Sequence, residues 1–210
     1  MDWHIRQATQ HGISFWIFDW YYDHRTDTIL GNNAALDKGF LNASLRSTMD
    51  FALLWCNEEK REPDFTESQL LRLVRTIGTR YLSQANYLRT SDGRNILGFT
   101  RPDRLITQFG ADGTGAALQA MCAEAKPWGG LFFIGIKTPT TAELTELKRA
   151  GFDACTLYSY EKHGMAADQK AADEHRANAE IDRVASKRRT DRPLFDDRHR
   201  RRKTTGPKDD

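Results

Sequence analysis

Two carboxylates follow apolar runs at positions that could carry out glycosidic bond cleavage. Asp19 lies near the end of the aromatic-rich run 13–20, and Glu58 comes just after the run 49–56. Glycoside hydrolysis uses two carboxyl groups, roughly 5 Å apart for retention of configuration and 6.5–9.5 Å for inversion. Neighbouring strands lie about 4.8 Å apart. If the two runs are adjacent strands, Asp19 and Glu58 are a candidate catalytic pair.

Aromatic rings and an amide accompany these carboxylates. Flat rings can stack on the C–H faces of a sugar, and amides can bond its hydroxyl groups. We therefore predict an oligosaccharide or polysaccharide substrate. The predicted substrate-binding residues are Trp20, Tyr21, Tyr22, Trp55, Asn57, Tyr158 and Tyr160. Two alternatives stay open: Asp19 caps the amides of the next loop, and Trp20, Tyr21 and Tyr22 pack rather than line a site.

No metal or other cofactor is predicted. The three cysteines lie far apart without CxxC spacing, and the histidines show no metal-ligand spacing. The glycine-rich stretch 110–115 does not match a dinucleotide or P-loop motif. The basic run 198–203 has no interleaved aromatic residues for base stacking, so no nucleic-acid partner is predicted.

Five apolar runs of strand length must position these residues. They span 13–20, 49–56, 95–100, 130–137 and 153–158. Amphipathic patterns indicate helices at 2–11, 33–46, 67–85, 102–109, 115–125 and 141–150. By residue type Thr66 suits a helix N-cap, and Gly110 and Gly151 suit helix ends. Alternation of this kind predicts an α/β fold with a parallel sheet, whose ligands bind at the carboxyl ends of the strands.

Composition places this fold in the first part of the chain. The 210 residues carry a net charge of +2, with 39% hydrophobic and 10% aromatic residues, so no global charge favours nucleic acid or a membrane surface. We expect no transmembrane helix and no signal peptide. Residues 1–163 form the predicted domain. Residues 164–210 are charge-rich and are predicted to be a helical or disordered tail.

Several short blocks, in order, resemble the glycoside hydrolase family 99-like barrels, which are endo-α-mannosidase-type enzymes with family 71-like relatives. The blocks span about residues 3–162. They are Gly12-Ile13 with Phe15-Trp16-Ile17-Phe18-Asp19-Trp20-Tyr21-Tyr22, Phe51-Ala52-Leu53-Leu54-Trp55-Cys56-Asn57-Glu58, Tyr87-Leu88-Arg89, Asp92-Gly93-Arg94-Asn95-Ile96-Leu97, Arg101-Pro102-Asp103-Arg104-Leu105 and Gly151-Phe152-Asp153-Ala154.

The resemblance implies a (β/α)8 TIM-type barrel that acts on α-linked glycans, of mannoside or glucan type, without a metal. It also implies substrate contacts from Asp19, Trp20, Tyr21, Trp55, Asn57 and Glu58. The family's late-strand catalytic motif, of W-N-E-W-x-E type, has no match after Glu161. About five strands are too few to close an eight-stranded barrel. We therefore expect an incomplete barrel from a larger gene product.

Three functional readings follow from this resemblance. The first is a glycoside hydrolase-like protein that lacks the late-strand carboxylates. The second is a non-catalytic carbohydrate-binding remnant. The third is a glycosyltransferase-like protein of polysaccharide biosynthesis, although no donor-phosphate motif is present. The resemblance suggests that this sequence is a partial copy of a family member. Its N-terminus therefore gives no prediction of the cellular compartment.

Overall fold

The computed structural model describes residues 1–57, 65–137 and 140–157. Its main sheet contains β1 (Phe15–Trp20), β4 (Asp50–Trp55), β5 (Asn95–Phe99), β6 (Leu131–Ile136) and β7 (Ala154–Thr156). Its α-helices are α1 (Asp2–Gln10), α2 (Glu67–Ile77), α3 (Pro102–Glu124) and α4 (Thr141–Arg149). A short antiparallel hairpin of β2 (Tyr22–Asp23) and β3 (Thr28–Ile29) follows β1. Residues 158–210, and so the predicted tail, lie outside the described residues.

The main sheet is parallel throughout, and its spatial order β1-β4-β5-β6-β7 is the order of its strands along the chain. The five strands coincide with the five predicted runs, each one to three residues shorter at one or both ends. The predicted α/β fold with a parallel sheet is therefore confirmed. Among the described residues, β1 and β7 are the two edge strands of the sheet.

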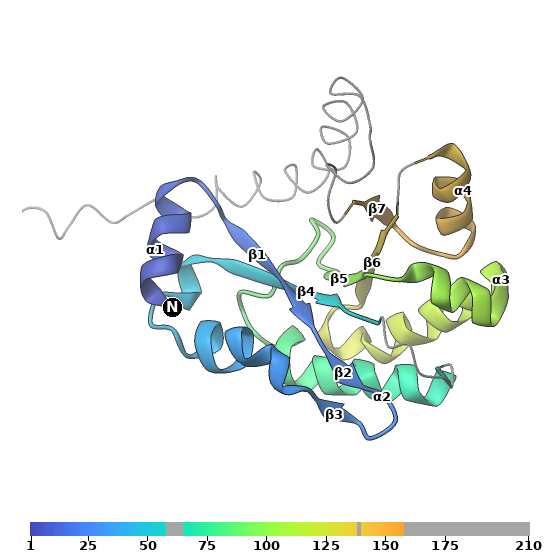
Figure 1. The fold of residues 1–210 in the computed structure, drawn as a ribbon, viewed down its shortest axis with the longest axis horizontal. Coiled ribbons are helices and arrows are strands. Elements are labelled where there is room, and N and C mark those ends of the chain that lie inside the picture. Colours follow the sequence, from blue (N-terminus) through green and yellow to red (C-terminus); the bar gives the residue numbers. More distant parts are fainter. Residues whose placement is uncertain (58–64, 138–139, 158–210) are drawn as a thin grey trace, which may run out of the picture.

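Helix α2 and the second half of α3 lie below the sheet in Figure 1 and cover one of its faces, whereas α1 lies at its left end and α4 at its upper right. Trp20, Trp55 and Phe99 are neighbours across β1, β4 and β5 on this covered face, and all three are buried. A side chain at Gly135 would meet Leu147 of α4 at 3.1 Å, which identifies the same face on β6. Because successive strand residues point to opposite faces, the residues between these positions belong to the other, open face.

Helix caps explain two of the boundaries. The Thr66 hydroxyl accepts a bond from the backbone of Gln69, and the Gln69 side chain accepts one from the backbone of Thr66, as a capping box requires. This confirms the predicted cap of α2. Thr140 caps α4 in a similar way through the backbone of Glu143.

Four of the predicted helices differ from the structure, and the one predicted at 67–85 continues past α2 as the π-helix η5 (Gly78–Leu82). Residues 33–46 form no α-helix. Instead, this part of the chain forms the 3-10 helices η1 (Gly31–Asn33), η3 (Phe40–Asn42) and η4 (Arg46–Thr48) and the π-helix η2 (Ala35–Gly39). Glycine and asparagine here favour local bonds over a regular helix, and the Asn42 amide donates to the carbonyl of Asp37 at 2.8 Å. The helices predicted at 102–109 and 115–125 run together as α3, which is broken at Gly110 by a left-handed φ of 70°.

Candidate functional site

A hollow of about 700 Å³ lies on the open face of the sheet. Its floor consists of aliphatic side chains from four strands, among them Ile17, Leu54, Ile96 and Ile134. Gly98 lies within this floor, and the Leu54 side chain fills the space beside it, because an added Cβ would meet Leu54 at 2.7 Å. Its polar groups come from Asp19, Tyr21, Asn32 and Thr156, which lie at or beyond the carboxyl-terminal halves of the edge strands.

Asp19 and Tyr21 are the two predicted site residues that the structure brings to this hollow. Asp19 is paired in register with Leu54, whose side chain belongs to the floor. It is the carboxylate among the described lining residues. A carboxylate beside an aliphatic floor can accept hydrogen bonds from ligand hydroxyl groups while apolar ligand surface packs below.

The buried side-chain amide of Asn33 fixes the backbone at Tyr21. The backbone N–H of Tyr21 donates to Oδ1 of Asn33 at 3.0 Å. Nδ2 of Asn33 donates to the carbonyls of Tyr21, at 2.7 Å, and Leu30, at 3.0 Å. Asn33 thus joins the end of β1 to the segment after the hairpin, and this bond set places Asn32 beside Tyr21 at the hollow.

Three other predicted site residues lie on the covered face instead. Trp20 is fully buried, stacks on Tyr22 and donates from Nε1 to the hydroxyl of Tyr81 at 3.2 Å. Trp55 packs against Phe65 and Phe99, and its indole N–H has no hydrogen-bond partner among the described residues. The alternation of the strands explains this: Trp20 and Trp55 point away from the neighbouring Asp19 and Leu54.

Asn57 joins two strand ends rather than lining the hollow. Its Nδ2 donates to the Arg101 carbonyl at 2.8 Å, and its Oδ1 accepts from the Arg101 backbone at 2.8 Å and the Thr100 hydroxyl at 3.1 Å. Arg104 donates to the Asn57 carbonyl at 2.7 Å. The bonds of this side chain serve the connection between β4 and β5. Glu58, Tyr158 and Tyr160 lie outside the described residues.

Sequence reasoning missed Asn32 and Thr156 as lining residues. Thr156 has the parity of the open face within the predicted strand 153–158, so counting alternate residues from the sheet interior would have identified it. Asn32 stands in the Gly31-Asn32-Asn33 triplet, a composition typical of turns. That signal predicts a turn but not which strand end the turn meets.

Charged groups beside the carboxyl ends of β5 and β6 pair with one another. The Arg101 guanidinium donates to the Asp103 carboxylate at 2.7 Å and holds the pKa of that carboxyl below its usual range. Lys137 lies 3.8 Å from Glu143. Each of these pairs balances its own charges, so neither pair supplies a net charge to a ligand.

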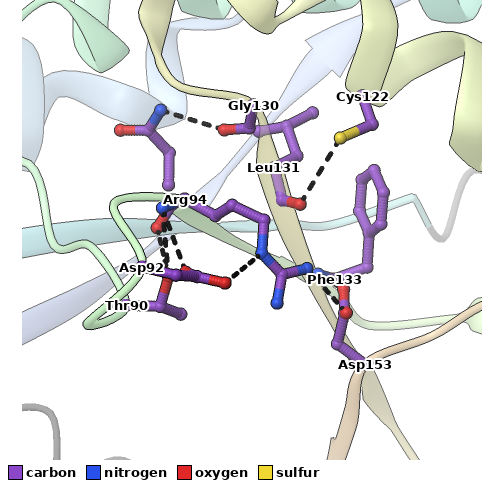
Figure 2. Close-up of polar contacts among 9 residues, drawn as sticks. Thr90, Asp92, Arg94, Cys122, Gly130, Leu131, Phe133 and Asp153 are labelled. Atoms are coloured by element: carbon purple, nitrogen blue, oxygen red, sulfur yellow. Dashed lines mark hydrogen bonds and ion pairs between the residues drawn. The ribbon is translucent and has the colours of Figure 1, made fainter.

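A second hollow, of about 550 Å³, lies at the amino ends of β5 and β6 and is lined by Arg94, Cys122 and Lys126 among others. Figure 2 shows that Arg94 is held between Asp92, at 3.0 Å, and Asp153, at 2.7 Å. The Cys122 thiol donates to the Leu131 carbonyl at 3.8 Å. The two carboxylates neutralise the guanidinium, which favours a structural role for this end of the sheet.

Comparison with protein-family models, curated proteins and solved structures finds no match for this chain. The family resemblance therefore depends on the sequence blocks alone. Within the described ranges, no group of three or more histidine, cysteine or acidic side chains is arranged to hold a metal. None of the helices described there is both long and apolar enough to span a membrane.

Proposed function

We propose that the open-face hollow binds an α-linked glycan and that the sheet is part of a barrel of the glycoside hydrolase family 99-like type. The observation that carries the proposal is the placement of Asp19 and Tyr21 together in one hollow at the end of β1. Asn32 adds an amide from the next turn. A carboxylate, a phenol and an amide above an apolar floor can bond hydroxyl groups and cover C–H surface.

The sheet topology supports the barrel part of the proposal. In a doubly wound sheet the strand order reverses at a switch point. Here each strand is followed in space by the next strand of the main sheet along the chain, and α3 and α4 both pack against the face on which Gly135 lies. That is the arrangement of successive units in a (β/α) barrel, whose ligands bind at the carboxyl ends of the strands.

Hydrolysis is the second candidate function. The backbone N–H of Cys56 donates to the Trp20 carbonyl at 2.9 Å, so the end of β4 lies directly beside the end of β1. Glu58 follows two residues later. In this reaction one carboxyl group would protonate the leaving oxygen, and the other would attack the anomeric carbon or activate water. Asp19 and Glu58 are our candidates for these roles.

Calorimetric titration of the full chain with α-mannosyl and α-glucosyl oligosaccharides tests the binding proposal. We expect Asp19→Asn and Tyr21→Ala each to weaken binding about tenfold, as the loss of one or two ligand hydrogen bonds implies. Asp112→Asn is the control, because this exposed carboxylate lies on α3, away from the hollow. Absence of binding to both classes of oligosaccharide, or equal affinity in all four proteins, would overturn the proposal.

The release of reducing sugar separates hydrolysis from binding alone. If Asp19 and Glu58 react, Glu58→Gln abolishes product release while calorimetry still detects the glycan. Binding without turnover in the unmodified chain would exclude the hydrolase reading and retain the carbohydrate-binding one.

A further inference from the structure

The polar groups of the open-face hollow are positioned in two different ways. Asp19 lies within β1, where the sheet pairs it in register with Leu54 of β4. Tyr21 follows the last residue of β1, and Asn32 lies in η1. The register between β1 and β4 ends at Trp20, so strand pairing does not extend to either residue. Tyr21 and Asn32 must therefore be placed at the hollow by other contacts.

The backbone of Tyr21 faces away from β4. The Trp20 carbonyl accepts from the backbone of Cys56 at 2.9 Å, and the Tyr21 N–H belongs to the same peptide group, whose C=O and N–H point in opposite directions. This N–H donates to Oδ1 of Asn33 at 3.0 Å. The Tyr21 carbonyl accepts from Nδ2 of Asn33 at 2.7 Å and from the backbone of Leu30 at 3.1 Å. The Asn33 side chain thus takes the place of a neighbouring strand.

The residues on either side of Tyr21 are anchored to the covered face. Trp20 and Tyr22 stack with their ring centroids 5.3 Å apart. The Tyr22 hydroxyl donates to Asp27 at 3.0 Å, and Arg72 of α2 pairs with the same carboxylate at 2.7 Å. Because successive side chains of an extended chain alternate, the Tyr21 side chain is directed to the other face, where it lines the hollow. The position of the phenol therefore depends on the short backbone segment that Asn33 holds.

Asn33 itself is buried behind the hollow. It is 2% exposed, whereas the neighbouring Asn32 is exposed and lines the hollow. Both Nδ2 hydrogens of Asn33 are used, one on the Tyr21 carbonyl and one on the Leu30 carbonyl at 3.0 Å. Its backbone N–H also donates to the Leu30 carbonyl, at 3.2 Å. A side chain with two donors and an acceptor suits this position, and one residue thus places both Tyr21 and Asn32.

We propose that Asn33 is a positioning residue for the open-face site. It fixes Tyr21 and Asn32 at the hollow, whereas the sheet positions Asp19 without it. This inference rests on the proposed function, since the contribution of Asn33 is measured as glycan affinity. The site is thereby divided into two parts. Asn33 and Tyr21 should be energetically coupled, because one acts through the other, and Asn33 and Asp19 should be independent.

A double-mutant cycle, measured by calorimetric titration of the full chain with α-mannosyl and α-glucosyl oligosaccharides, tests the proposal. Asn33→Ala should weaken binding about tenfold in the otherwise unmodified chain. In the Tyr21→Ala background its effect should fall to about threefold or less, because the phenol that it positions is absent. In the matched Asp19→Asn background the effect should stay about tenfold. An equal effect in both backgrounds, which a general loss of structure would produce, or no effect of Asn33→Ala alone, would overturn the proposal.

Residue-resolved hydrogen exchange of the ligand-free chain, measured by NMR, separates this proposal from glycan binding. In Asn33→Ala the Tyr21 amide should exchange at least about tenfold faster, whereas the Cys56 amide, which donates to the Trp20 carbonyl, should be unchanged. If no glycan binds, the proposed function fails, and exchange alone decides whether Asn33 holds Tyr21. A Tyr21 amide that exchanges at the same rate in both proteins would contradict the positioning role.

Circular dichroism checks that Asn33→Ala is folded. If it is not, Asn33→Asp replaces it in the titrations, because it has the same shape and keeps the acceptor of the Tyr21 N–H but removes both donors. The unmodified chain gives a further check: the Nδ2 protons of the buried Asn33 should exchange more slowly than those of the exposed Asn32. Equal exchange rates for the two side-chain amides would also overturn the proposal.

Discussion

Alternate residues of β1 belong to two different environments. Trp20 packs among the aromatic rings of the covered face and is fully buried, whereas Asp19 belongs to the open-face hollow. The covered face is aromatic and tightly packed, and its rings lie 5–6 Å apart. The open-face hollow has a largely aliphatic floor, with Phe15 and Phe18 also among its lining residues, and its polar groups lie at one end. One face therefore determines stability, and the other is available for binding.

The largest loss of stability should come from shortening a buried side chain on the covered face. Trp55→Ala should lower the free energy of unfolding by about 3–5 kcal/mol, the usual cost of deleting a large buried aromatic side chain. Ile17→Ala, on the open face, should cost less than about 1 kcal/mol. Urea unfolding at low protein concentration measures both. Similar losses for the two variants would contradict the division of roles between the faces.

The contrast between the two faces also shows which parts of the structure could be predicted from the sequence. The five strands were predictable because nearly continuous apolar runs of this length suit strands buried in a parallel sheet. Trp20 and Trp55 were predicted to line the site, but the structure places them on the covered face. Both lie at the end of a strand, but successive side chains alternate between the two faces, and these two rings point toward the helices. Position along the chain identified the correct edge of the sheet, and alternation decided which residues face the hollow.

The turns of residues 31–48 were less predictable. Buried Leu36 and Phe40 have helical spacing, which favoured a helix, but the segment is fixed by contacts with distant residues. The Tyr81 hydroxyl donates to Asp37 at 2.9 Å, and Arg80 pairs with the same carboxylate. Such tertiary bonds have no local signature. Likewise, only the folded chain shows that Asn57 joins β4 to β5.

Removing the Asn57 side chain should have the next largest effect. Asn57→Ala leaves the Arg101 backbone N–H without its acceptor and the Thr100 hydroxyl with only the Trp55 carbonyl, at 3.3 Å, so we expect a loss of about 1–3 kcal/mol in the free energy of unfolding. Thermal unfolding measures it. If Asn57 instead bound ligand directly, the variant would retain its stability and lose glycan affinity, which calorimetry would detect.

Alkaline pH should lower the free energy of unfolding through the buried tyrosines of the covered face. Burial raises the pKa of Tyr81 to about 12 and also raises that of Tyr87. Above pH 10 the unfolded chain loses these phenolic protons while the folded chain keeps them, so stability should fall as pH rises from about 10 to 12. Urea unfolding across this range tests the slope. Tyr81→Phe should reduce it, and an unchanged slope would contradict the assignment.

The smallest effect should come from the ion pairs at the amino ends of β5 to β7 (Figure 2). Arg94 pairs with Asp153, whose other oxygen accepts from the Phe133 backbone at 2.8 Å. Because these charges are partly exposed, Arg94→Gln should cost no more than about 1 kcal/mol of unfolding free energy, and less at high salt. Glycan affinity should not change, because this end is opposite the open-face polar groups. A loss of affinity in Arg94→Gln, but not in Asp112→Asn, would instead place binding in the second hollow.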